Sequence, residues 1–153
     1  MDEADAQCRL SIAENRKRGQ ERPLAYAYLT KADIERDRGD LQDAERHAKQ
    51  ALELFIRLDD KDGEAQAYRT LANIFRYLHK FEQALRYLEA GISLAEGNHS
   101  LPLLASLYQL YGRTVRHFAT LEDDAKDLQS GLGNKKYPEK SDLFQKALDA
   151  LRM

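Results

Sequence analysis

The chain has 153 residues, about the length of one domain, and is long enough to bury a hydrophobic core without disulfides or metal. Its 24 Lys and Arg nearly balance 26 Asp and Glu, so a net charge of -2 gives no general attraction to nucleic acid or acidic membranes. The single cysteine, Cys8, excludes an intrachain disulfide framework, and no apolar run approaches the roughly 20 residues of a membrane span. The N-terminus is acidic and does not resemble a signal peptide, so we expect a cytoplasmic protein. The composition is rich in helix-forming residues.

A spacing of 40 residues recurs along the chain and marks an internal repeat. Small residues let two helix axes approach closely, and large residues fill the gaps between them, so each repeat is predicted to be a pair of packed helices. The residues that carry this spacing are Tyr28, Tyr68 and Tyr108, then Ala32, Ala72 and Gly112, then Leu41, Phe81 and Leu121, and finally Ala44 and Ala84.

Residues 2–17 are predicted to form a lone helix ahead of the first complete repeat. Ala4 and Cys8 stand 40 residues before Ala44 and Ala48, which gives this stretch the register of a second repeat helix. Cys8 is therefore expected to be a small buried residue, not a reactive thiol. The stretch either caps the repeats or belongs to a longer repeat array.

Two complete repeats follow, at residues 25–58 and 65–97. Gly39 supplies a permissive backbone for the turn inside the first of them. A single helix pair cannot bury its own apolar faces, so neighbouring repeats are expected to stack. Their four helices are expected at about 24–38, 41–58, 64–78 and 81–96.

A third repeat starts at residues 102–121, with its first helix expected at about 102–118. Residues 122–138 are predicted to interrupt it, because two glycines and Pro138 mark a loop. A C-terminal helix is expected at residues 139–152, where apolar residues recur at helical spacing. This helix would complete the third repeat, cap the stack, or block its binding surface.

The repeat resembles the tetratricopeptide repeat. That family places a large residue at position 4, small residues at positions 8, 20 and 27, and Gly near position 15. The units are about 40 residues long, as in an extended subtype, rather than about 34, and the resemblance covers roughly residues 1–121. Asp124 stands where Ala is expected, and the terminal Pro of the family is missing. The matching residues are Tyr28, Ala32, Gly39, Leu41, Ala44 and Ala51 in the first repeat, and Tyr68, Leu71, Ala72, Phe75, Phe81, Ala84 and Gly91 in the second.

This resemblance implies an all-α fold: a right-handed α-solenoid of stacked antiparallel helix pairs, with about three repeats and helical ends. The whole chain, residues 1–153, is then a single domain.

A polar stripe rich in arginine runs along the first helix of each repeat. At about 100° per residue, positions 2, 5, 9, 12 and 13 fall on one side, away from positions 3, 4, 7, 8 and 11 that face the core. Arg36, Arg76 and Arg116 share position 12. A helix face that is simply exposed to solvent would show the same periodicity of polar residues. The other residues on this side are Tyr26, Leu29, Asp33, Asp37, Gln66, Arg69, Asn73, Tyr77, Ser106, Gln109, Arg113 and His117.

The family resemblance implies that this side lines a concave surface that binds extended peptides. By that resemblance, Asn73 would bond a peptide main chain, and Arg69 and Arg113 would bind carboxylates, for which the arginine fork is suited. Asp33 and Asp37 partly neutralise the first repeat, so the positive field is expected in the second and third. The candidate groove residues are Arg36, Arg69, Asn73, Arg76, Tyr77, Gln109, Arg113 and Arg116.

The function predicted from these features is a non-catalytic protein-interaction module that binds an acidic peptide or tail. The alternative is a regulatory or assembly module that self-associates through its incomplete ends. No metal or other cofactor is expected, because the four histidines share no metal-ligand spacing and the "GLGNKK" stretch lacks the ending of a phosphate-binding loop. Neither nucleic acid nor a membrane is expected as a partner.

Overall fold

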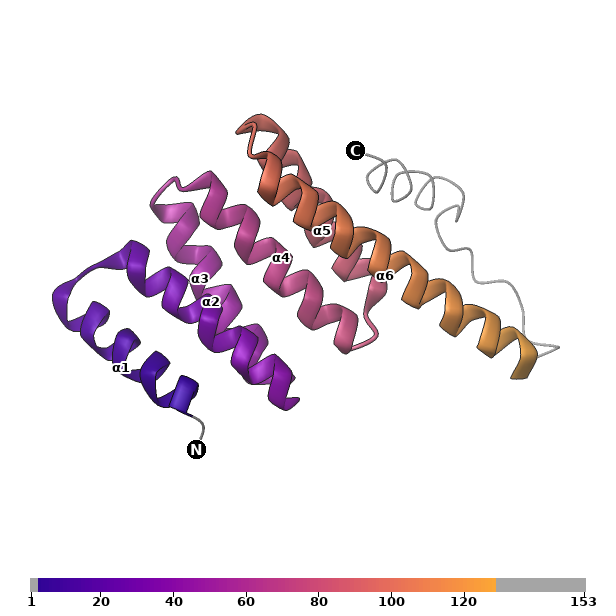
Figure 1. Cartoon of the computed structure of the whole chain (residues 1–153), viewed down its shortest axis with the longest axis horizontal. Helices are drawn as coiled ribbons and strands as arrows, with labels where there is room; N and C mark the ends of the chain where they lie inside the picture. Colours follow the sequence, from indigo (N-terminus) through magenta and orange to yellow (C-terminus); the bar gives the residue numbers. More distant parts are fainter. Residues whose placement is uncertain (1–2, 129–153) are drawn as a thin grey trace.

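The computed structural model describes residues 3–128, with side chains as far as residue 123. Within that part of the chain, every regular element is an α-helix (Figure 1). The helices are α1 (Glu3–Arg18), α2 (Glu21–Arg38), α3 (Leu41–Arg57), α4 (Lys61–Tyr77), α5 (Phe81–Gly97) and α6 (Leu101–Leu128).

All five turns between these helices share one backbone design. Each turn contains one residue with a positive φ, in the left-handed region, and these residues are Gly19, Gly39, Asp59, His79 and His99. The next residue then donates its N–H to a carbonyl five positions back, as Asp40 does to Glu35 at 2.8 Å. This pattern satisfies helix-end carbonyls and reverses the chain. The predicted role of Gly39 is confirmed by its φ of 86°.

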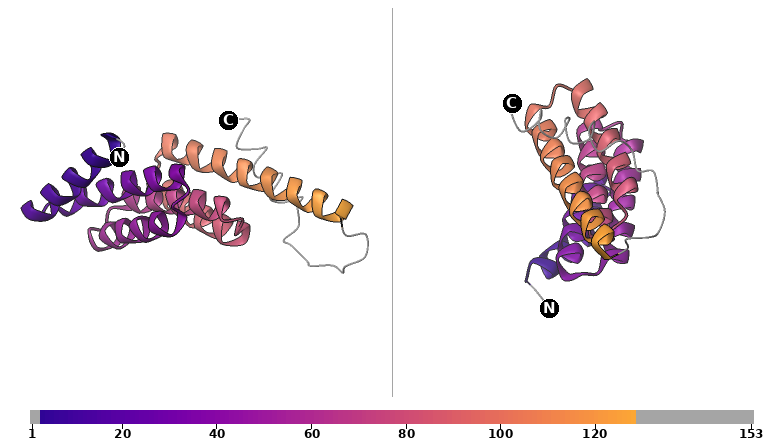
Figure 2. Two further views of the ribbon diagram at one scale, coloured as in Figure 1. Left: turned by 90° about the horizontal axis from the view of Figure 1, so that it is seen from below. Right: turned by 90° about the vertical axis from the view of Figure 1, so that its right-hand side faces the viewer.

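The helices form a solenoid of antiparallel pairs, as predicted. Each first helix packs on its own second helix, α2 on α3 and α4 on α5, and each second helix packs on the first helix of the next pair. The first helices α2, α4 and α6 also contact one another in order. Seen from the side in Figure 2, α3 and α5 lie below α2 and α6. One layer of first helices therefore spans the described repeats.

The core sits between these layers, and the small residues of the repeat are at its closest approaches. Ala32, Ala44, Ala72 and Ala84 are all 0% exposed, as the 40-residue register predicts. Cys8 is buried, as predicted, and its thiol donates to the carbonyl of Ala27 at 3.3 Å.

Helix α4 starts earlier than predicted, at Lys61 instead of near residue 64. Asp60 explains the difference, because its carboxylate accepts the N–H of Gly63 at 3.0 Å and caps the helix. Gly63 therefore lies inside the first turn of α4 and is not part of a connector.

Helix α6 is longer than predicted. It continues through Leu128, so the expected helix end near residue 118 is wrong, and residues 122–128, which were assigned to the interruption, are helical. The stretch "LEDDAKDL" contains no Gly or Pro, and nothing in its covalent chemistry stops a helix. The rest of the predicted interruption and the C-terminal helix at 139–152, with its capping or blocking role, lie outside the described residues.

One residue of the predicted polar stripe belongs to the core. Leu29 is only 6% exposed and packs in the cluster that contains Phe55 and Leu54. An apolar side chain on a mostly polar face is drawn into the nearest apolar contact, and α3 and α4 supply it.

Candidate functional site

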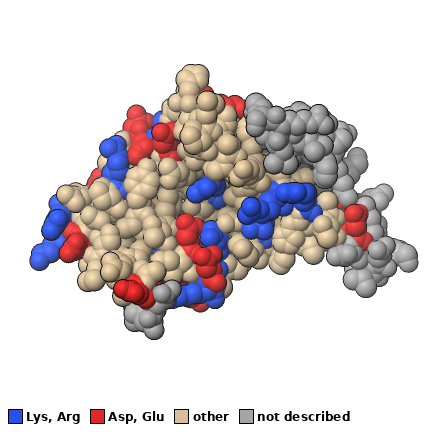
Figure 3. Space-filling view, in the orientation of Figure 1, with Lys and Arg blue, Asp and Glu red and all other residues tan. Residues whose placement is uncertain are grey.

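A hollow of about 270 Å³ lies between the three first helices, and we call it the central hollow. Helices α2, α4 and α6 each contribute polar side chains to it, because the 40-residue register places the same helix face at each step. Figure 3 shows Lys and Arg gathered over α4 and α6 in the middle of this face, beside mixed charges over α2. The lining residues are Asp33, Arg36, Arg69, Thr70, Asn73, Ser106, Gln109, Leu110 and Arg113.

Five of the eight predicted site residues line the central hollow: Arg36, Arg69, Asn73, Gln109 and Arg113. The structure thus brings together side chains from three helices that are 40 residues apart in sequence. The other three predicted residues, which are not part of its lining, are Arg76, Tyr77 and Arg116.

The arginines of the central hollow differ in whether they have a carboxylate partner. Arg36 is paired twice, with Asp33 at 2.8 Å and with Asp37 at 3.0 Å. Arg69 and Arg113 form no ion pair with any residue in the described part of the chain. The two unpaired guanidinium groups come from α4 and α6, so the positive charge available to a ligand lies on that side of the hollow.

Asn73 and Arg76 are joined to each other. The guanidinium group of Arg76 donates to the Asn73 side-chain oxygen from Nη2 at 2.9 Å and from Nε at 3.2 Å. The same guanidinium lies 4.7 Å from the ring centre of Tyr77, as in a cation–π contact. Arg76 therefore fixes the amide orientation, and the Asn73 NH₂ group is left to face the hollow.

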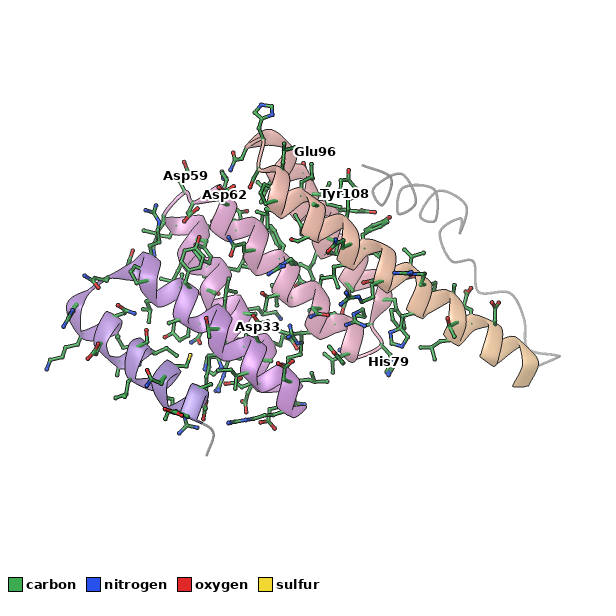
Figure 4. All side chains as sticks on the ribbon, viewed as in Figure 1. Asp33, Asp59, Asp62, His79, Glu96 and Tyr108 are labelled. Atoms are coloured by element: carbon green, nitrogen blue, oxygen red, sulfur yellow. The ribbon has the colours of Figure 1, made fainter. Side chains whose placement is uncertain are left out.

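Asp33 sits at the α2 side of the central hollow, where Figure 4 marks it between α2 and α4. Burial raises the pKa of its carboxyl above the usual value, while the charges of Arg36 and Arg69 oppose that rise. The carboxylate occupies part of the positive field that a bound anion would use.

The sequence prediction missed two residues that line the hollow, Thr70 and Leu110. Both stand at position 6 of their repeats, only about 20° around the helix from position 13, so a wider arc would have included them. Both are almost fully buried, at 5% and 7% exposure, and they form the floor between the polar walls.

It also missed a buried ionic cluster where α1 packs on α2. The ammonium group of Lys31 hydrogen-bonds to the carboxylate of Asp5 and lies 3.6 Å from Glu35. Arg9 and Arg38 also contact Asp5, each at 3.3 Å. Lys31 and Glu35 stand at core positions 7 and 11 of the first repeat, and their charged character at those positions was the available signal.

Neither a metal centre nor a membrane span is found in the described part of the chain. No three His, Cys, Asp or Glu side chains of residues 3–123 gather as metal ligands would. None of the described helices is both long enough and apolar enough to cross a bilayer.

Comparison with known proteins identifies the family. A sequence model described as tetratricopeptide repeat matches residues 23–97, which include the helix pairs α2–α3 and α4–α5. The chain is a tetratricopeptide repeat protein. Tetratricopeptide repeats generally mediate protein–protein interactions and typically act without catalysis.

A solved structure shares the fold. It is described as the crystal structure of BtubC (BKLC) from P. vanneervenii, and it is 19% identical with a TM-score of 0.55. The similarity covers 87% of this chain and 62% of that one, so this tetratricopeptide repeat protein spans less than two thirds of its neighbour's length. A search of curated proteins returned no significant match.

Proposed function

We propose that this tetratricopeptide repeat protein is a non-catalytic interaction module whose central hollow binds an extended, acidic peptide segment. The observation that carries the proposal is the pair Arg69 and Arg113, which line the hollow from neighbouring helices without a carboxylate partner in the described chain. A cation that is not neutralised by its own protein is free to bind a ligand carboxylate. The single buried Cys8 suits the cytoplasm as the site of action.

Each polar group of the hollow has a distinct role in this proposal. Arg69 and Arg113 bind side-chain or terminal carboxylates through two parallel hydrogen bonds each. The Asn73 amide, oriented by Arg76, donates to a main-chain carbonyl of the peptide, and Gln109 adds a second amide on α6. Arg36 strengthens the field but is already held by two aspartates.

Two of the three predicted residues outside the hollow lining, Tyr77 and Arg116, extend the peptide-binding surface beyond the hollow. Arg116 is exposed on the next turn of α6 beyond Arg113, and Tyr77 is 48% exposed at the end of α4. A peptide longer than the hollow would pass over both of them. Their contribution is expected to be small, since exposed charges are screened by solvent and salt.

The test is direct binding of a fluorescent peptide with alternating Glu residues, with a Gln-substituted peptide of the same length as control. Arg69→Gln and Arg113→Gln are each expected to weaken binding by about 10-fold, the scale of one charge-assisted hydrogen bond. Arg57→Gln is the matched control, because the Arg57 side chain is 64% exposed on α3 and does not line the hollow. Equal affinity for the two peptides would refute the proposal.

Asp33 offers a substitution with the opposite sign. Asp33→Asn removes a carboxylate that competes for Arg36 and for the field of Arg69, so affinity for the acidic peptide should rise several-fold. Its effect should shrink as salt is raised, because the interaction is electrostatic. Weaker binding of the acidic peptide to Asp33→Asn would contradict the assignment of the hollow.

A further inference from the structure

A second hollow, of about 450 Å³, lies between α1 and α3 and is floored by α2. We call it the basic cleft. Helices α1 and α3 both pack on α2 but do not contact each other, which leaves the gap open. Its functional side chains are Arg9, Arg16, Tyr28, Lys31, Arg46 and His47, and it shares no lining residue with the central hollow.

The floor of the basic cleft offers hydrogen-bond donors that the protein does not use up. The ammonium group of Lys31 has three N–H donors, and the described chain supplies two carboxylates for them, Asp5 and Glu35. The hydroxyl of Tyr28 accepts a hydrogen bond from Arg16, so its own hydrogen remains available. On the α3 wall, His47 donates from Nδ1 to the Glu35 carboxylate at 2.9 Å, which leaves Nε2 without a partner in the described chain, an acceptor in the neutral ring and a donor in the protonated one.

The walls of the basic cleft carry arginines on both sides. Arg9 and Arg16 stand on α1, and Arg46 stands on α3, each on an exposed side chain. A group bound between the helices would therefore meet guanidinium groups from opposite directions. Guanidinium donors arranged in this way suit an oxyanion with several oxygens, since each arginine can take two of them.

The charge around the basic cleft is positive. No carboxylate lines it. Of the carboxylates that pair with its basic residues, Asp5 and Glu35 are buried, and Asp43 is exposed on α3. Together with Arg38, five basic side chains face three carboxylates, so the local excess is about two positive charges. The carboxylates concerned are Asp5, Glu35 and Asp43.

The next repeat shows that the fold does not need these buried charges. Forty residues after Lys31 and Glu35 stand Leu71 and Phe75, which are 0% and 4% exposed and belong to the apolar core. Lys31 and Glu35 are buried almost as deeply, at 7% and 5%. Buried ion pairs add little stability compared with apolar residues of similar size, because desolvation offsets their attraction. Stability of the fold therefore does not explain why Lys31 and Glu35 are buried in the first repeat, whereas binding of a ligand would explain it.

We propose that the basic cleft binds a phosphate group, carried either by a small molecule or by a phosphorylated side chain. A phosphate monoester carries close to two negative charges and has three acceptor oxygens, which matches the local charge and the donors from three helices. Arg16 and Arg46 clamp the phosphate from the two walls, and Lys31 and Tyr28 donate from the floor. The site is independent of the peptide site proposed above.

The first test is isothermal titration calorimetry of the full chain with inorganic phosphate, and with a phosphoserine peptide beside its unmodified serine form. We expect a Kd for phosphate below about 1 mM at constant ionic strength. Arg16→Gln and Arg46→Gln should each weaken it about 10-fold. Arg86→Gln is the matched control, because Arg86 stands 40 residues after Arg46 and is exposed on α5.

A second variant keeps the result interpretable if the basic cleft tolerates change poorly. Lys31→Leu with Glu35→Phe installs the residues of the second repeat, and circular dichroism checks that the variant stays folded. Phosphate binding should be lost in this folded variant, and the ring-nitrogen NMR signal of His47 should stop responding to phosphate.

A comparison of the probes identifies the source of the phosphate group. A phosphopeptide that binds more tightly than phosphate identifies a phosphorylated protein as the source, and equal affinities identify a small anion.

Two results would overturn the proposal. One is the absence of heat and of His47 shifts with all three probes at millimolar concentration. The other is equal weakening of phosphate binding by Arg16→Gln and by the control Arg86→Gln, which would mean that phosphate only screens surface charge.

Discussion

Replacing Gly63 with alanine should destabilise the contact between the first and second repeats. The ring of Phe55 on α3 lies directly against the backbone of Gly63 on α4. An alanine Cβ at residue 63 would stand 2.1 Å from Cδ1, 2.3 Å from Cε1 and 2.7 Å from Cγ of that ring. Carbon atoms in contact prefer about 3.5 to 4.0 Å, so the ring or the helix must move by more than about 1 Å.

The size of the effect follows from how little room the ring has. Phe55 is 0% exposed, and its ring packs edge-on against Tyr26 with 4.9 Å between centroids. Overpacking a closed core costs about 1 to 3 kcal/mol, and the overlap with a whole ring puts Gly63→Ala near the upper end. The better helix propensity of alanine returns about 1 kcal/mol. We therefore expect a net loss of about 2 kcal/mol in the free energy of unfolding.

The assay is urea unfolding followed by far-UV circular dichroism. Gly97→Ala is the matched control, because Gly97 is the last residue of α5 and an added Cβ there would meet nothing within 4 Å. That control should keep or slightly raise the unfolding midpoint. A wild-type midpoint for Gly63→Ala would refute the steric reasoning.

A double substitution tests whether the clash is with the ring itself. Phe55→Leu alone should destabilise the protein by leaving a cavity. Combined with Gly63→Ala, it removes the ring edge that the new methyl group meets. The double variant should therefore lose less stability than the sum of the two single losses, by at least about 1 kcal/mol. Strict additivity would place the cost of Gly63→Ala elsewhere.

Three further predictions concern single groups. Tyr111→Phe should raise the free energy of unfolding by about 1 kcal/mol, because the Tyr111 hydroxyl is buried without a hydrogen-bond partner in the described chain; an unchanged or lower urea midpoint would contradict this. His99→Gly should add about 0.5 to 1 kcal/mol by relieving a φ of 54°, and the reverse change at the turn, Gly39→His, should lower the midpoint. Asp5 has a pKa lowered chiefly by its hydrogen bond from Lys31, with burial opposing; its stabilisation is present above the unfolded pKa of about 3.9 and is lost as pH falls through the folded pKa. Asp5→Asn should therefore unfold at lower urea than wild type near neutral pH, and the gap should close in strong acid; a gap that is the same at every pH would refute the linkage.

Local chemistry made much of the fold predictable from the sequence. The 40-residue register placed Ala32 and Ala72 in the core, and the turn at Gly39 followed from the backbone freedom of glycine. Other boundaries were missed for local reasons too. The cap at Asp60 started α4 early, and α6 could continue because residues 121–128 contain no Gly or Pro.

The candidate site was only half predictable. Helical periodicity placed Arg36, Arg69 and Arg113 on one face, since that face depends only on the turn angle per residue. Periodicity could not tell which arginines are neutralised. Arg36 is paired with aspartates of its own helix, whereas Arg76 turns to Asn73 and Tyr77, and these choices depend on rotamers and on neighbouring side chains.

The sequence by itself determined the helix pairs, their 40-residue register and the polar stripe, because these follow from residue type and helical geometry. Only the tertiary structure decided the charge partners. Lys31 meets Asp5 from 26 positions away, and a hydrogen bond at that separation exists only once α1 has packed on α2. Only packing, likewise, opened the basic cleft between α1 and α3 and set the ring of Phe55 on Gly63, because contacts between distant segments depend on how whole helices dock.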